Sequence, residues 1–184
     1  MATSAFHVRS QSLPSPLRTI LAAGLTAGAL DILGAIIVYV YIMNVTTVMR
    51  LLQGIARGAF GRSAFNGGMA MALAGLGFHF IIAFSFTVFY FVIFPFIPFL
   101  GKQKIISGLL YGIFIWCIMN LIVLPLLHVA PVPTKWDSIV RSAGILMACV
   151  GIPVSLIISR HYRSNAIKMP RKELQPPPGN QRGF

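Results

Sequence analysis

The sequence predicts an all-α membrane protein in which four transmembrane helices form a bundle, and three observations support this fold class. Of the 184 residues, 57% are hydrophobic and only 10% are charged, a composition far from that of a soluble globular domain. Four apolar segments are each long enough to cross a hydrocarbon layer of about 30 Å, which takes about 20 helical residues. The remaining residues make short loops and two tails, so the chain has no room for a separate soluble domain.

The apolar segments divide the chain into three parts. A transmembrane domain, 17–159, is expected between an N-terminal tail, 1–16, and a basic, disordered C-terminal tail, 160–184. The predicted spans are residues 17–43, 67–94, 105–128 and 138–159. The first span does not fit a signal peptide, because its apolar run exceeds the roughly 7–15 residues of a signal sequence and no small-residue cleavage site follows it.

Asp31 is the most informative residue of the first span. It is the only acidic residue in the first 136 positions, and it lies within an unbroken apolar run from Ile20 to Met43. A carboxylate at the centre of a hydrocarbon layer is costly unless it is paired, neutralised or hydrated. Ionisable groups at such positions are functional candidates by default, so Asp31 is the first candidate for a functional residue.

Residues 45–60, between the first two spans, predict a short amphipathic helix. Apolar residues recur at helical spacing from Val45 to Phe60, and Arg50, Gln53 and Arg57 fall on the opposite face. Two interpretations are open. The helix lies in the membrane interface with its arginines toward anionic head groups, or it is a loop helix that packs over one end of the bundle.

A stripe of small residues in each span predicts where the helices pack. Lipid gives little hydrophobic drive for helix association, so helices in membranes associate through close backbone contact at small residues. The central glycines of these stripes are Gly24, Gly28, Gly75, Gly108, Gly112 and Gly151. Aligning Gly68 with Gly144 also aligns Gly75 with Gly151, a faint match that is compatible with two repeated hairpins.

Three polar side chains are predicted to converge inside the bundle. Asp31 lies three residues after Gly28, His79 lies four residues after Gly75, and Asn120 occupies the third span. They lie about 20, 22 and 24 Å from the end of the bundle that holds the termini, at 1.5 Å per residue. An imidazole beside a buried carboxyl group can share its proton, and an asparagine amide can donate to a carboxylate. The cluster therefore fits a proton relay, a cation site or a purely structural clasp.

The lysine and arginine residues predict the orientation of the chain. Ten of them lie on the side that holds both termini and five on the other, which favours both termini in the cytoplasm. Arg163, Lys168, Arg171 and Lys172 follow the last span, where each charge attracts anionic head groups by about 1 kcal/mol. The net charge of +12 therefore indicates the lipid bilayer as a partner and not a nucleic acid.

No residue pattern indicates catalysis or a bound group. The sequence lacks metal-ligand spacings, a nucleophile elbow, a glycine-rich phosphate loop and a pair of carboxylates. We therefore expect no catalytic residue, no metal and no cofactor, and an enzyme is the last of the functions considered. A four-helix bundle is too small to enclose a wide pathway alone, so a homo-oligomer is expected.

The second span carries a family resemblance. It is rich in phenylalanine, and Phe89, Tyr90, Phe91 and Phe94 fit an aromatic belt at the membrane interface. The run from Phe78-His79-Phe80 to Phe94-Pro95, with Gly108-Leu109-Leu110 and Leu124-Pro125-Leu126, resembles the uncharacterised YagU-like bacterial inner-membrane proteins over the central half of the chain. The resemblance implies a bacterial inner-membrane location and supplies no activity.

Two hypotheses about the function are favoured over the others. The first is a small proton- or cation-linked transporter or channel built around Asp31, His79 and Asn120. The second is a structural or regulatory membrane protein in which the same three residues only clasp the helices together.

Overall fold

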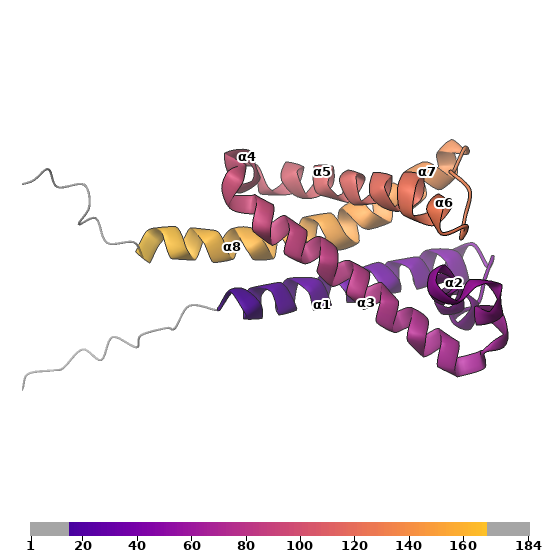
Figure 1. The fold of residues 1–184 in the computed structure, drawn as a ribbon. Coiled ribbons are helices and arrows are strands. Elements are labelled where there is room, and N and C mark those ends of the chain that lie inside the picture. Colours follow the sequence, from indigo (N-terminus) through magenta and orange to yellow (C-terminus); the bar gives the residue numbers. More distant parts are fainter. Residues whose placement is uncertain (1–14, 169–184) are drawn as a thin grey trace, which may run out of the picture.

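The computed structural model describes residues 15–168, and the regular structure of that part of the chain is entirely helical. Four helices are long and apolar enough to cross a membrane: Pro16–Ile42, Gly68–Phe96, Lys104–Leu126 and Trp136–Ser164. They alternate in direction and form a bundle (Figure 1), which confirms the predicted fold class. Of the predicted tails, residues 1–14 and 169–184 lie outside the described residues. Residues 160–168, predicted as the start of the disordered C-terminal tail, are instead helical.

The bundle has two distinct ends, which we name by what they carry. The terminus end holds the start of the first span, the end of the last span and the short helix α4; the loop end holds α2 and the connection from α6 to α7 (Figure 1). The α-helices are α1 (Pro16–Ala35), α2 (Val48–Phe60), α3 (Gly68–Ile93), α4 (Pro98–Lys102), α5 (Lys104–Cys117), α6 (Leu124–Leu126), α7 (Trp136–Leu146) and α8 (Ile152–Lys168). Short 3₁₀ turns follow α2 at Gly61–Asn66 and α3 at Phe94–Phe96.

Local sequence explains where the first helices begin and end. Ser15 precedes α1 and its hydroxyl accepts a hydrogen bond from the backbone N–H of Arg18, while Pro16 occupies the first helical position. Thr47 caps α2 in the same way. Gly61 ends α2 with a φ of 65°, a left-handed conformation that glycine adopts without steric cost.

The last helix is longer than the predicted span. The structure continues α8 to Lys168, whereas the sequence places the end of the span at residue 159. Polar residues start there, but His161 and Tyr162 still pack inward against the ring of Phe91. The helix therefore extends beyond the apolar run because its next turn still has partners inside the bundle.

Glycines bring α1 and α3 into close contact. A Cβ atom at Gly28 would lie 2.8 Å from the ring of Phe80, and one at Gly24 would overlap the ring of Phe84. The two phenylalanines therefore sit in gaps that only glycine leaves open on α1. This contact sets the separation of the first two spans.

A second glycine contact joins α5 to the last span. A Cβ atom at Gly108 would lie 2.8 Å from the carbonyl oxygen of Gly151, and one at Gly112 would overlap the backbone of Met147. Gly75, which aligns with Gly151 in the faint repeat, instead faces the backbone of α2 at Leu52. Gly151 thus packs against another membrane-spanning helix, whereas Gly75 packs against the short helix α2.

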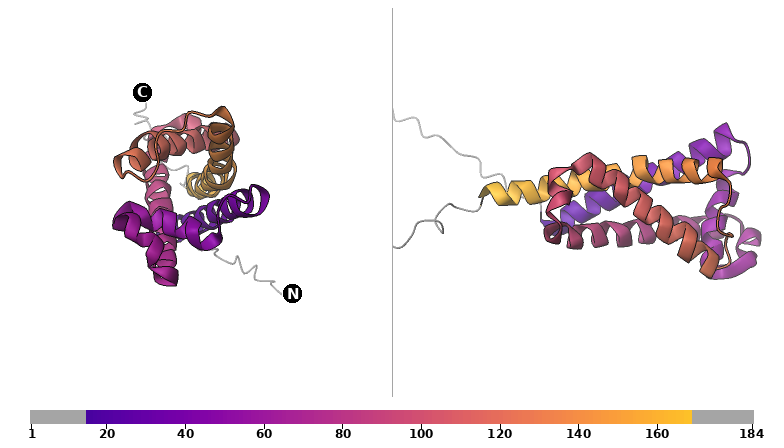
Figure 2. Two further views of the ribbon diagram at one scale, coloured as in Figure 1. Left: turned by 90° about the vertical axis from the view of Figure 1, so that its right-hand side faces the viewer. Right: turned by 90° about the horizontal axis from the view of Figure 1, so that it is seen from above.

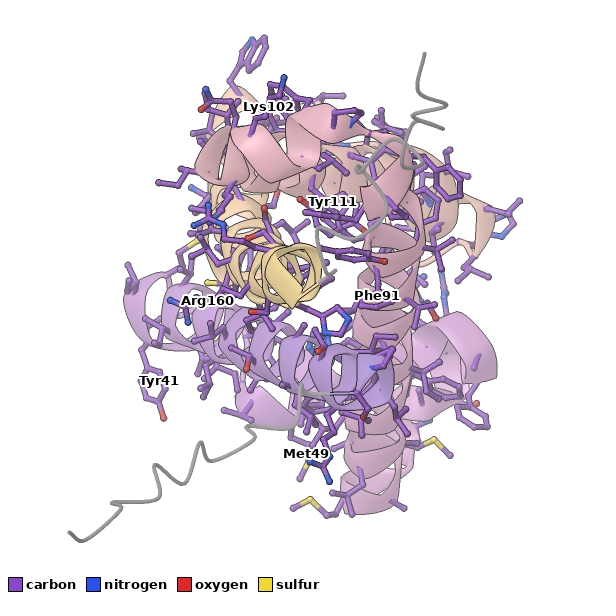
Figure 3. All side chains as sticks on the ribbon, turned by 90° about the vertical axis from the view of Figure 1, so that its left-hand side faces the viewer. Tyr41, Met49, Phe91, Lys102, Tyr111 and Arg160 are labelled. Carbon is purple, nitrogen blue, oxygen red and sulfur yellow. The ribbon has the colours of Figure 1, made fainter. Side chains whose placement is uncertain are left out.

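The hydrophobic core extends from the middle of the bundle toward the terminus end. It is formed by Ala23, Ala27, Tyr90, Phe94, Tyr111, Ile115, Val150, Val154 and Ile158. Seen from that end, Phe91 and Tyr111 point between the helices, whereas Tyr41 points away from the body (Figure 3). The assignment of Tyr90 and Phe94 to an interfacial belt is therefore wrong: both are buried, and Tyr90 is only 1% exposed.

The amphipathic helix α2 packs over the loop end of the bundle. Gln53 is 3% exposed and donates a hydrogen bond of 3.0 Å to the carbonyl oxygen of Gly68 at the start of α3. The Arg57 guanidinium donates to the carbonyl oxygen of His128, at 2.7 Å. Val48 and Met49 are exposed, so part of the apolar face points outward. These contacts favour the loop-helix interpretation and correct the placement of Gln53 on an outward polar face.

Candidate functional site

The candidate site is a cavity of about 410 Å³ in the loop half of the bundle. All four spans and α2 contribute to its wall, and most of the lining side chains are apolar. Viewed from the loop end, α1 and α2 lie on one side and α5 and α7 on the other, while α3 crosses from the first group to the second (Figure 2). The lining residues with polar side chains are Asp31, Tyr39, His79, Asn120 and Ser142.

Asp31 lies on this wall near the end of α1 and is partly buried. Its carboxylate accepts no hydrogen bond from any group in residues 15–168, and the single ion pair in that part of the chain joins Arg141 to Asp137. The imidazole of His79 interacts electrostatically with the Asp31 carboxyl group, and both side chains line the cavity. Asp31 therefore presents a carboxylate to the cavity without a direct partner.

His79 ties α3 to α1 and also reaches the cavity. Its Nε2 atom lies 2.8 Å from the carbonyl oxygen of Gly28. A carbonyl oxygen can only accept, so Nε2 carries the hydrogen and Nδ1 is left for other partners. His79 therefore acts as a clasp between two spans, while its ring shares the cavity wall with Asp31.

Asn120 lines the same cavity from the third span, within the π-helical turn Ile118–Val123. Its side-chain amide donates 3.1 Å to the carbonyl oxygen of Trp116, one turn earlier in its own helix. The structure therefore brings Asp31, His79 and Asn120 to one cavity. No hydrogen bond joins any two of these three side chains among residues 15–168.

A chain of buried hydroxyl groups closes the bundle on the terminus side of the cavity. The Tyr90 hydroxyl donates to Ser155 Oγ at 2.9 Å, and Ser155 Oγ donates to the carbonyl oxygen of Lys104 at 2.7 Å. A phenol has one hydrogen, so Ser107 Oγ, 2.6 Å from the Tyr90 oxygen, donates to it. We name Ser107, Tyr90, Ser155 and the Lys104 carbonyl the hydroxyl chain. It joins α3, α5 and α8, and its three side chains are almost fully buried.

The floor of the cavity lies directly above the hydroxyl chain. Phe86, Ile115 and Val150 line the cavity, and the Tyr111 hydroxyl donates to the carbonyl oxygen of Phe86. Ile115 and Val150 also belong to the hydrophobic core of the bundle. The cavity is therefore separated from the terminus end by packed side chains and satisfied hydroxyl groups.

The roof of the cavity is formed by α2 and the residues that follow α6. Leu51, Ile55 and Gly58 line the cavity from α2, and Leu127 and Val129 line it from the connection to α7. The hydrogen bond from Arg57 to the His128 carbonyl joins these two parts of the roof. The roof therefore depends on the contact between α2 and the connection to α7.

Three spans change from α- to π-helical geometry beside the cavity. The π-helical turns are Ile36–Ile42, Ile118–Val123 and Met147–Gly151, and each contributes lining residues. Two of them stand directly before Pro125 or Pro153, whose rings clash with the carbonyl groups four residues earlier. A wider helical turn relieves that clash, and π-turns occur often at functional sites.

The sequence carried signals for some of these features and none for others. Pro125 and Pro153 could have indicated the two π-turns that precede them, but Ile36–Ile42 has no such marker. Tyr90, Ser107 and Ser155 stand on three separate spans and are common residue types, so nothing in the sequence linked them.

The predicted lipid-contacting residues have mixed surroundings. Arg50 and Arg163 are exposed, whereas Arg57 is partly buried and bonded to His128. Lys168 is the last residue of α8, and Arg171 and Lys172 lie outside the described residues. Residues 15–168 contain no group of three or more His, Cys, Asp or Glu side chains arranged to hold a metal ion.

No protein-family model, curated protein or solved structure matches this chain. The function must therefore be argued from the cavity and its residues.

Proposed function

We propose that this integral membrane protein moves protons or small cations across the bacterial inner membrane, with Asp31 as the charged group of the translocation site. One observation supports this above the others. Asp31 presents a carboxylate without a hydrogen-bond partner to a cavity inside the bundle. A carboxylate that only held helices together would be bonded to a neighbouring span, because an unsatisfied charge in a membrane is costly.

The asymmetry of the bundle supports the same proposal. The cavity lies in the loop half, while the hydroxyl chain and the core close the terminus half. Alternating access requires a site that one side of the membrane reaches while the other is closed. In the proposed cycle, movement of α2 opens the loop side and parting of the hydroxyl chain opens the terminus side.

The location and assembly belong to the same proposal. The excess of lysine and arginine on the terminus side favours cytoplasmic termini, so the loop end faces the periplasm. The resemblance to YagU-like proteins supports an inner-membrane location. Anionic head groups are the partners for the basic residues that follow the last span, and a homo-oligomer would supply further helices around the pathway.

A structural or regulatory role is the second candidate, and the His79 contact favours it. The hydrogen bond from His79 to the Gly28 carbonyl holds α3 against α1 regardless of any transport. Interhelical hydrogen bonds in membranes contribute about 0.6 kcal/mol on average, so such a clasp is a modest stabiliser. On this alternative, Asp31 could be neutralised by mutation without loss of any flux.

The test is a flux measurement in liposomes that contain purified protein. Wild-type protein should move protons, or an alkali cation, faster than protein-free liposomes under an imposed potential. Asp31→Asn should reduce that flux to background because the substitution removes the charge and keeps the shape. Asp137→Asn is the matched control, since Asp137 is 67% exposed at the start of α7 and does not line the cavity.

Two results would contradict the proposal. One is equal flux in wild type and Asp31→Asn. The other is no flux of protons, sodium or potassium above background in wild-type protein of demonstrated native fold.

A further inference from the structure

The size of the cavity argues against a bare ion as its occupant. Its volume of about 410 Å³ falls within the roughly 300–1,000 Å³ that is typical of pockets for small organic molecules. A single metal ion or proton would leave nearly all of this space empty. An occupant with an apolar body would give the apolar part of the wall the packing contacts that a bare ion cannot supply.

The lining also has too few oxygen atoms to replace the hydration shell of a metal cation. Hard cations such as Ca²⁺ take about six to eight oxygen ligands. The cavity offers the side-chain oxygens of Asp31, Tyr39, Asn120 and Ser142. The Ser142 hydroxyl is already engaged, because it donates to the Ser138 carbonyl and accepts from the Trp116 indole N–H. A weakly hydrated organic cation does not need such a shell.

The cavity wall carries an acidic side chain and no lysine or arginine side chain. Asp31 is its one acidic residue. The other titratable groups on the wall are the His79 imidazole, which donates to Gly28, and the Tyr39 phenol. Outside the wall, the Arg57 guanidinium is turned to the His128 carbonyl. The carboxylate therefore acts as the single counter-charge for an occupant.

Aromatic and aliphatic groups cover the rest of the wall. Phe86 lies at the floor and Tyr39 near the loop end, and aromatic faces attract organic cations. Ile82, Ile145 and Leu146 supply aliphatic surface between them. The lining thus combines one negative charge with a large apolar surface.

We propose that the cavity binds an organic cation with a bulky apolar body, whose positive centre pairs with Asp31. This inference rests on the proposed function and deepens it by naming the class of substrate. The proton of the proposed function would then share Asp31 with the organic cation, and the two would exchange at one carboxylate.

The experiment uses two probes of equal size and opposite charge. Binding of tetraphenylphosphonium and of tetraphenylborate is measured by equilibrium dialysis on protein in lipid nanodiscs, with empty nanodiscs as the background. Wild type and Asp137→Asn should bind the phosphonium, and Asp31→Asn should bind it at least tenfold more weakly. The borate should not bind above background, and potassium should not displace the phosphonium.

A second variant keeps the test valid if Asp31→Asn does not fold. Met119 lines the cavity from the third span and is partly exposed, so Met119→Trp fills space without changing the charge. It should weaken phosphonium binding about tenfold because the larger side chain occupies the space of the ligand. Unchanged phosphonium binding in Met119→Trp would overturn the inference.

Each remaining outcome separates this inference from the proposed function. Asp31-dependent flux without phosphonium binding, or displacement of the phosphonium by potassium, overturns the substrate class and leaves transport intact. Binding of both probes that is insensitive to Asp31→Asn shows an apolar cavity open to lipid chains, and also overturns it. Absence of both binding and flux refutes both proposals.

Discussion

The His79 imidazole on α3 donates a hydrogen bond to the backbone carbonyl oxygen of Gly28 on α1, at 2.8 Å. The contact depends on the close approach of the two helices, because Phe80, the next residue, fills the gap that the missing side chain of Gly28 leaves. Three residues further along α1, Asp31 reaches the cavity that His79 also lines. Helix packing and the candidate site therefore share one small region of the bundle.

Gly28→Ala should destabilise the protein by about 1–3 kcal/mol, because the added methyl group overlaps the Phe80 ring. Thermal unfolding in a mild detergent measures the loss. Gly77→Ala is the control, since a Cβ atom there meets nothing within 4 Å and alanine favours the helix. Equal destabilisation by both substitutions would show that the α1–α3 contact is not as close as described.

His79→Leu should lower the free energy of unfolding by about 0.6–1.7 kcal/mol, the range measured for interhelical hydrogen bonds in a membrane protein. His79→Gln should recover part of the loss, because its amide can still donate to the Gly28 carbonyl. Unfolding of the purified protein in mixed detergent micelles gives both values. No difference between the two variants would mean that the donated hydrogen bond is not what His79 contributes.

Tyr90→Phe should break the hydroxyl chain and cost about 1–3 kcal/mol, because Ser107 and Ser155 lose a buried partner. The free energy of unfolding of Tyr90→Phe is compared with that of Tyr41→Phe. This variant is the control, because it loses the same hydroxyl group from a side chain that is 69% exposed. In liposomes, Tyr90→Phe should also raise the passive leak of protons above that of Tyr41→Phe. A stable, tight Tyr90→Phe protein would remove the hydroxyl chain from the proposed closure.

Arg57→Gln should loosen the roof of the cavity, because it removes the hydrogen bond to the His128 carbonyl. Amide hydrogen exchange in residues 48–60 should then become severalfold faster. Arg50→Gln is the control, because it removes one positive charge from an exposed position on the same helix. If both variants accelerate exchange equally, attraction to head groups holds α2 and the packing contact does not.

The fold was largely predictable from the sequence, and the site only in part. Long apolar runs have few structural solutions in a membrane, so the four spans followed from hydropathy. Asp31 and His79 stood out because ionisable groups are rare in such runs. The burial of Gln53 was not predictable, because it depends on the carbonyl of Gly68, which the turn after α2 brings within reach.

The cavity itself has no sequence signature. It is lined from all four spans and α2, so it depends on how these helices, with their glycine contacts and π-turns, are placed relative to one another. Tyr90 was misassigned for a similar reason. The sequence around an aromatic residue near the end of a span looks the same whether its side chain faces lipid or the core. Periodicity alone could not separate the two.

The dense core at the terminus end and the hollow at the loop end have an evolutionary consequence. Most residues of the hydrophobic core and most residues that line the cavity occupy different halves of the same four helices, and Ile115 and Val150 belong to both sets. Substitutions at lining positions such as Ile82 or Val123 can reshape the hollow while the core remains unchanged. Descendants of this chain could therefore acquire new ligands without first losing stability, as long as the glycine contacts are retained.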